Sequence, residues 1–233
     1  MSFSLFDQYD LRARMSVGII LVSPLLFYLY MQIAAIRSLS ATTIIIVILF
    51  ALSNYIIVFV RYNGKTVYSK RETTAEFLYS DQIDNVTKRR FYEKLAQADK
   101  AFSILLEQTD HSAPEFREAC VSAVNWLKEH SRDSDLVRKE SILYGFCRNM
   151  LGIRTFGLIS SILLLLFQII QIVLSYPQVS LELLISAIVT LAYFALWFWG
   201  ITKSLVDFSA KNYAEALIFS LDRIEISKSA NDN

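Results

Sequence analysis

Residues that make turns are scarce in this sequence, which has three prolines and six glycines among 233 residues. Turn-rich β folds need more of both, so this scarcity favours long helices. Two cysteines, Cys120 and Cys147, are too few for the disulfide framework of a small secreted domain, and we interpret them as free thiols. The net charge of +1 lacks the basic excess of a nucleic-acid-binding domain, so no direct nucleic-acid partner is expected.

Residue patterns that support catalysis or metal binding are also missing. The two histidines, His111 and His130, have no cysteine or carboxylate arrangement typical of a metal site or a catalytic triad. The chain contains no GxGxxG, Walker loop, HExxH or Arg-x4–6-His pattern. We therefore expect a non-enzymatic protein that needs neither a cofactor nor a bound metal.

Long apolar runs are what the sequence has in abundance. Hydrophobic residues make up 54% of the chain and charged residues 19%, and the two kinds are segregated. Four runs approach the roughly 20 residues that cross a bilayer; they cover residues 16–36, 41–60, 155–174 and 181–202. The segments 16–60 and 155–202 together hold one basic and one acidic residue, Arg37 and Glu182. They predict two transmembrane hairpins.

The section between the hairpins, residues 61–154, holds 16 Lys/Arg and 14 Asp/Glu, which indicates a water-exposed helical domain. Residues 112–115, Ser-Ala-Pro-Glu, match a capping box with proline in the first helical turn. The helix that follows carries four small or apolar residues at spacings of four, three and four, which predicts a buried stripe. The stripe consists of Phe116, Cys120, Ala123 and Leu127.

The two ends of the chain are predicted to lie on the same side of the membrane. Residues 1–15 mix apolar and charged side chains, as an interfacial segment does, and residues 203–233 form an amphipathic tail. All but one of the 23 Lys/Arg lie in these ends or in the middle section. The positive-inside rule therefore places both termini and the middle section in the cytoplasm. The predicted fold is an all-α, multi-pass protein of the bacterial inner membrane, with a cytoplasmic helical domain inserted between spans two and three.

One stretch, residues 144–154 with the sequence YGFCRNMLGIR, combines close-packing residues with positive charge at the predicted entry to the third span. Arginines there are suited to lipid head groups, and glycines allow a close approach of another helix. A simple interfacial anchor accounts for the arginines but not for the glycines or the asparagine. We interpret the stretch as a hinge that couples the cytoplasmic domain to the membrane, through Tyr144, Gly145, Arg148, Asn149, Gly152 and Arg154.

Two further groups of polar residues are weaker candidates. Gln168 and Gln171 share one face of the third span, where they either line a pore in an oligomer or join neighbouring helices, and the second role is the more common. Lys88, Arg89 and Arg90 are candidates for contact with an anion or a partner. Such a run is more often the solvated face of a helix, and Glu93 nearby weakens its field.

These motifs resemble those of uncharacterised bacterial four-span inner-membrane proteins, which have an arginine pair before the first span and a YGFxRNxxG motif before the third. Arg12 and Arg14 match the pair, and residues 144–152 match the motif. The order of spans and soluble section is also similar to that of membrane components of bacterial antiphage systems.

The expected function is that of a homo-oligomeric membrane effector or sensor. The resemblance implies a role in antiphage defence, in which the cytoplasmic domain receives a signal and the protein then acts on membrane integrity. Its expected partners are membrane lipids, further copies of the chain, and a cytoplasmic protein from the same operon. The alternatives are a constitutive channel or stator-like subunit, and a scaffold that recruits a soluble partner.

Overall fold

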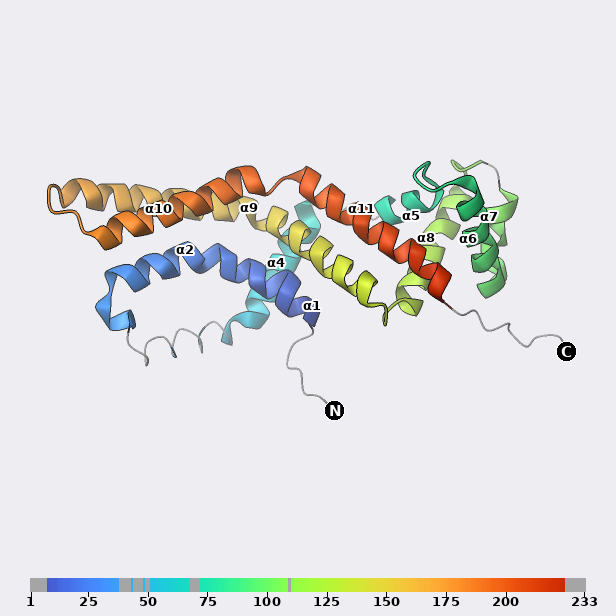
Figure 1. Ribbon diagram of the computed structural model, residues 1–233, viewed down its shortest axis with the longest axis horizontal. Helices are drawn as coiled ribbons and strands as arrows, with labels where there is room; N and C mark the ends of the chain where they lie inside the picture. Colours follow the sequence, from blue (N-terminus) through green and yellow to red (C-terminus); the bar gives the residue numbers. More distant parts are fainter. Residues whose placement is uncertain are drawn as a thin grey trace. The chain divides into compact units, whose positions relative to one another are not determined.

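The structure, a computed structural model, describes residues 8–37, 43, 48, 51–67, 72–108 and 110–224 (Figure 1). It is all-helical, with no strand among these residues. The chain divides into two compact units, residues 1–69 with 145–206, and residues 70–144 with 207–233. The helices α9, Asp135–Leu174, and α11, Lys203–Phe219, each begin in one unit and end in the other.

The first unit holds the apolar helices. Its further elements are α1 (Gln8–Asp10), the π-helical turn η1 (Leu11–Met15), α2 (Ser16–Gln32), η2 (Ala34–Arg37), α4 (Ser53–Val67), α10 (Leu181–Ala195) and the π-helical turn η4 (Leu196–Gly200). In Figure 1, α10 returns alongside the second half of α9 after a short turn, and α2 contacts α10. A small apolar cluster of Tyr28, Leu164 and Leu183 joins these three helices.

Three helices in the described ranges are long and apolar enough to cross a membrane: Leu11–Gln32, Asp135–Leu174 and Leu181–Gly200. They overlap the predicted first, third and fourth spans. Most of residues 41–52, the first part of the predicted second span, lies outside the described residues, and α4 continues past its predicted end at Val60 as far as Val67. The all-helical fold is confirmed, whereas the count of four spans stays a prediction.

The second unit is a helical bundle with one continuous apolar core. It is built from α5 (Glu72–Tyr79), α6 (Asn85–Ala98), η3 (Lys100–Ser103), α7 (Ile104–Glu107), α8 (Pro114–His130) and η5 (Ser220–Arg223), with one part each of α9 and α11. The helix α6 begins where the Asp84 carboxylate accepts a hydrogen bond from the Thr87 amide at 2.9 Å. Hydrogen bonds from the side chain and then the amide of Thr87 lower the pKa of Asp84. Local capping thus sets the start of one core helix.

The predicted stripe on α8 forms the middle of this core. Its four residues, Phe116, Cys120, Ala123 and Leu127, have no exposed surface. The helix begins with Pro114 as expected, but the capping box is wrong, because no side chain caps this helix and the Ser112 hydroxyl donates to Asp110 instead. Proline in the first turn needs no hydrogen bond from its own nitrogen, so the helix starts without the cap.

The end of α11 and the turn η5, both in the segment predicted as an amphipathic tail, also belong to this core. Ala214, Leu217, Ile218 and Leu221 are buried in the same cluster as the α8 stripe. The Lys94 ammonium donates to the carbonyl oxygens of Leu221 and Asp222, at 3.1 and 3.3 Å. The helical domain is therefore discontinuous in sequence, since a C-terminal segment completes it.

The buried Cys120 thiol is expected to be unreactive in the folded protein. Burial raises its pKa from the ordinary 9.0 to about 12. At pH 8 the thiolate, which is the nucleophile, is then about a thousandfold rarer than in the unfolded chain. Alkylation of the Cys147→Ser variant, followed by mass spectrometry, should be at least about a hundredfold slower in the native state than in denaturant.

The same shift predicts a dependence of stability on pH. Because the pKa is raised on folding, the contribution of the protonated thiol is present below pH 9 and is lost as the pH rises from 9 towards 12. Equal alkylation rates in the native and denatured protein would contradict the burial of Cys120.

Candidate functional site

The YGFCRNMLGIR motif lies inside α9, which is helical without interruption from Asp135 to Leu174. No described glycine has a positive φ, so neither Gly145 nor Gly152 makes a turn. The predicted hinge is therefore a continuous helix in the structure. The boundary between the two units falls within the motif, between Tyr144 and Gly145.

Gly145 and Gly152 are contact points between α9 and other helices of the first unit. A Cβ at Gly145 would collide with the Tyr9 ring and would lie 3.2 Å from the Ala13 Cβ, both at the start of the chain. A Cβ at Gly152 would meet the backbone of α4, at 2.5 Å from the Gly64 Cα and 2.6 Å from the Asn63 carbonyl carbon. Small residues at such crossings let helix backbones approach closely, as is common in membrane proteins.

Asn149 lies between these two glycines on the same face of α9, four residues after Gly145 and three before Gly152. It is fully buried, and its amide nitrogen donates to the Ala13 carbonyl at 2.6 Å. Its side-chain oxygen lies against Gly64 and has no hydrogen-bond partner among the described residues. Asn149 thus connects α9 to η1 and packs on α4 at the same time.

Arg154 makes its hydrogen bonds to the backbone at the end of the α10 segment. Its Nε donates to the Trp197 carbonyl at 2.9 Å, and one terminal nitrogen donates to the Phe198 carbonyl at 2.8 Å. Both carbonyls belong to η4, where the helix ends and its last carbonyls lack helical partners. In the structure the two nitrogens contact protein rather than being left for lipid head groups, and the cation complements the negative end of the helix dipole.

Trp197 of η4 packs on Gly157, which lies about one turn beyond Arg154 on α9. The indole has no exposed surface, and a Cβ at Gly157 would collide with its ring. The ring therefore occupies the space left by the missing side chain. Residues 145–157 of α9, together with the residues of α1, η1, α4 and η4 that they contact, form what we call the junction cluster.

Replacing Arg154 by lysine is expected to destabilise the junction cluster. Lysine keeps the charge but cannot present two fixed donors to two carbonyls. A hydrogen bond from a charged donor contributes about 1.5–3 kcal/mol, so we expect a loss of about 1.5 kcal/mol. Thermal unfolding of the detergent-solubilised chain measures it, with Arg61→Lys, an exposed arginine of α4, as the control. Equal melting temperatures for the two variants would contradict a stabilising role for the hydrogen bonds of Arg154 to the Trp197 and Phe198 carbonyls.

The other two predicted junction residues have different surroundings. The Tyr144 ring stacks on the Tyr213 ring of α11 within the second unit, at 5.9 Å between centroids and 7° between planes. Arg148 is half-buried on α9, and Cys147 beside it is buried. Six residues picked from one motif thus divide between the two units, with Tyr144 alone in the second.

Gln168 and Gln171 contact two different helices. The Gln168 side chain is fully buried, and its amide nitrogen donates to the Ser186 hydroxyl of α10 at 3.4 Å. The Gln171 side-chain oxygen accepts a hydrogen bond from the Tyr28 hydroxyl of α2 at 2.7 Å. The two glutamines thus connect α9 to α10 and to α2 by hydrogen bonds.

Each residue of the basic run has an acidic partner in the second unit. Arg89 pairs with Glu93 at 3.0 Å and Arg90 with Asp222 at 2.8 Å. Lys88 is buried and lies 3.9 Å from a carboxylate oxygen of Asp81. Because each of these charges has an acidic partner within the second unit, the arrangement favours a paired helix face over an anion site.

Several residues of the junction cluster were missed from the sequence. These are Tyr9, Ala13, Gly64, Gly157 and Trp197. The available signal was Gly157 inside the predicted third span and Gly64 shortly after the predicted second span. Which helix each glycine faces depends on contacts between residues far apart in the chain, and no local pattern contains that information.

Within the described ranges, no group of three or more His, Cys, Asp or Glu residues is arranged to hold a metal ion. No protein-family model, curated protein or solved structure matches the chain.

Proposed function

We propose that this chain is a homo-oligomeric sensor or effector of the bacterial inner membrane, with four spans and both termini in the cytoplasm. In this proposal the second unit binds a cytoplasmic protein partner encoded in the same operon. The signal then passes along α9 into the membrane bundle, and the protein acts on membrane integrity without enzymatic chemistry. A role in antiphage defence rests on the similarity of organisation described above.

The observation that carries the proposal is the continuity of α9. Forty residues form one helix, about 60 Å long at 1.5 Å per residue. It begins in the second unit and ends in the first. In the proposal, a displacement of the first turns of α9 passes along this helix to the junction cluster. Coupling of this kind requires a ligand that contacts two states of the protein differently.

The first test follows the membrane potential of bacteria that express the chain and are then infected with phage. We expect a potential-sensitive dye to report depolarisation only after infection. A constant leak in uninfected cells would instead indicate a constitutive channel or a stator-like unit. Co-purification of a soluble partner with no electrical response at any time would leave the scaffold and reject the effector.

Arg148→Ala is expected to separate signal from response. The residue lies in the first turns of α9 after the unit boundary, so its removal should abolish depolarisation while the protein still inserts in the membrane. Arg61→Ala, which removes an exposed arginine of the same unit, is the matched control and should respond normally. If Arg148→Ala instead lowers the amount of membrane-inserted protein, the residue is an anchor and not part of the coupling.

A further inference from the structure

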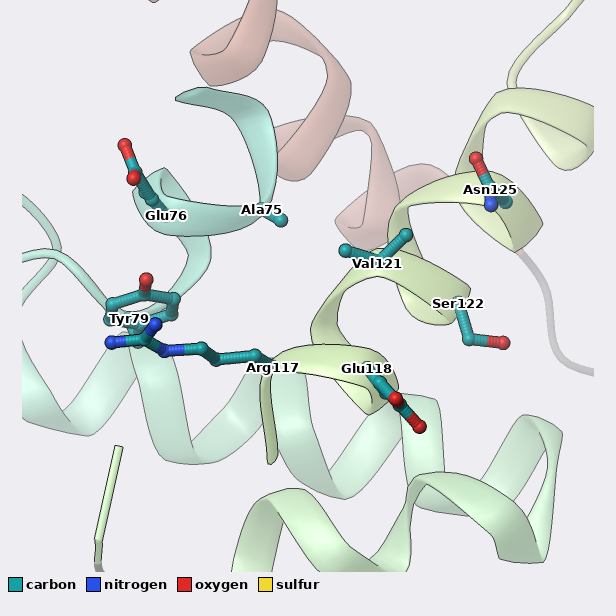
Figure 2. Close-up of a pocket in the computed structure, with 8 residues that line it drawn as sticks. All are labelled: Ala75, Glu76, Tyr79, Arg117, Glu118, Val121, Ser122 and Asn125. Atoms are coloured by element: carbon teal, nitrogen blue, oxygen red, sulfur yellow. The ribbon is translucent and has the colours of Figure 1, made fainter. Parts of the chain in front are cut away.

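The second unit contains a groove between α5 and α8, with a volume of about 400 Å³ (Figure 2). Ala75, Glu76 and Tyr79 line it from α5, and Arg117, Val121 and Asn125 line it from α8, together with two neighbours on α8. The two helices pack on the core through other faces, since Leu78 and Cys120 are fully buried there. Small-molecule sites in proteins have volumes of about 300–1,000 Å³, so the groove is large enough for a ligand.

The centre of the groove is apolar. Figure 2 shows Ala75 and Val121 pointing towards each other from the two helices. Val121 is 46% exposed, so its side chain is accessible to a ligand. The Tyr79 ring stands at one end, held edge-on against Phe116 with centroids 5.7 Å apart. This centre presents aliphatic and aromatic surface to a ligand.

Charged groups surround the apolar centre. The Arg117 side chain extends from α8 towards the Tyr79 ring, while Glu76 and Glu118 stand at the rim, one on each helix. None of the three charged side chains has a salt bridge or hydrogen bond to a described residue, whereas the basic run on α6 is fully paired. The groove therefore offers one exposed cation beside the Tyr79 ring and two exposed carboxylates at the rim.

The length of the groove limits the ligand. Arg117 and Asn125 are eight residues apart on α8, which corresponds to about 12 Å along the helix. An extended peptide covers about 3.3–3.6 Å per residue, so three to four residues span this distance. A single amino acid occupies only the end beside Tyr79.

The geometry points to a binding site for a small zwitterion with an apolar side chain, of the class of amino acids and short peptides. Its carboxylate pairs with Arg117, where a guanidinium offers two parallel hydrogen bonds. Its apolar side chain lies over Ala75 and Val121 beside the Tyr79 ring. Its ammonium group faces the rim, where Glu76 and Glu118 favour positive charge.

The inference rests on the proposed function in one respect only, which is that the ligand acts as the signal received by the second unit. Binding is measured on the purified chain without any membrane response. If the protein binds the zwitterion but never depolarises the membrane, the site is supported and the sensor proposal is rejected. If the protein depolarises the membrane but does not bind the zwitterion, the sensor proposal is supported and the site is rejected.

Isothermal titration calorimetry on the detergent-solubilised full chain tests the site with phenylalanine and the dipeptide phenylalanyl-leucine. Phenylalaninamide lacks the carboxylate and N-acetylphenylalanine lacks the ammonium group. We expect both analogues to bind at least about tenfold more weakly than phenylalanine, since a hydrogen bond to a charged group has a large effect.

Variants then assign each charge. Arg117→Gln should weaken phenylalanine binding at least about tenfold and remove the preference for phenylalanine over its amide. The double variant Glu76→Gln with Glu118→Gln should instead remove the preference for phenylalanine over its N-acetyl form. Arg132→Gln, and the double variant Glu129→Gln with Asp133→Asn, change exposed charges outside the groove and should bind as the unchanged protein does.

Three results would overturn the proposal. The first is that neither phenylalanine nor phenylalanyl-leucine binds to the unchanged protein. The second is that the amide and N-acetyl forms bind as tightly as phenylalanine. The third is that the control variants outside the groove weaken binding as much as the groove variants, while thermal unfolding shows all of them to be folded.

Discussion

Gly152→Ala is expected to destabilise the protein by about 2 kcal/mol or more, because the added methyl group has no space. It would lie 2.5 Å from the Gly64 Cα and 2.6 Å from the Asn63 carbonyl carbon. Both atoms belong to the backbone of α4, which cannot rotate aside as a side chain can. Alanine favours a helix over glycine by about 1 kcal/mol, so the collision must outweigh that gain.

Gly200→Ala is the matched control for this change. The nearest atom to a Cβ at Gly200 is the Leu196 Cδ1 at 3.0 Å, the end of a flexible side chain that can adjust. Thermal unfolding in detergent should therefore show a large loss for Gly152→Ala and a change within about 1 kcal/mol for Gly200→Ala. A Gly152→Ala protein as stable as the unchanged chain would show that α4 and α9 do not cross at this point.

Trp197→Ala is expected to cost about 3–5 kcal/mol, the usual range for truncation of a buried large aromatic residue. The indole has no exposed surface and packs directly on Gly157. Its ring nitrogen has no hydrogen-bond partner among the described residues, so the loss comes from packing. Trp197→Phe, which keeps much of the ring, should cost less.

Trp199 provides the comparison, since it lies two residues away in the same π-helical turn and is 69% exposed. Trp199→Ala should change the unfolding temperature of the solubilised protein only slightly. If the two alanine variants unfold at the same temperature, the contact of Trp197 with α9 does not stabilise the junction cluster.

The motif around Gly152 could be recognised from the sequence, but its role could not. Glycines, an asparagine and arginines at a membrane entry indicated close packing, and Gly145, Asn149 and Gly152 do pack closely on other helices. The hinge was inferred from composition, because glycine is compatible both with turns and with close helix crossings. In the structure α9 is unbroken here, and both glycines lie at close contacts with other helices.

The partner of Arg154 illustrates the same limit. The sequence suggested lipid head groups, because an arginine beside an apolar run commonly reaches them. In the structure its donors contact carbonyls of Trp197 and Phe198, more than forty residues further along the chain. The irregular end of the α10 segment exposes those carbonyls, and nothing in residues 144–154 encodes that irregularity.

By itself, the sequence determined the all-helical class, the apolar helices and the buried stripe of α8. These follow from local composition and from the 3.6-residue period, which each helix carries in its own residues. The tertiary structure decided that the end of α11 completes the core of the second unit, and which helices Gly152, Asn149 and Arg154 contact. The reason is physical: a periodic pattern tells which face of a helix is buried, whereas the surface that covers it comes from residues distant in the chain.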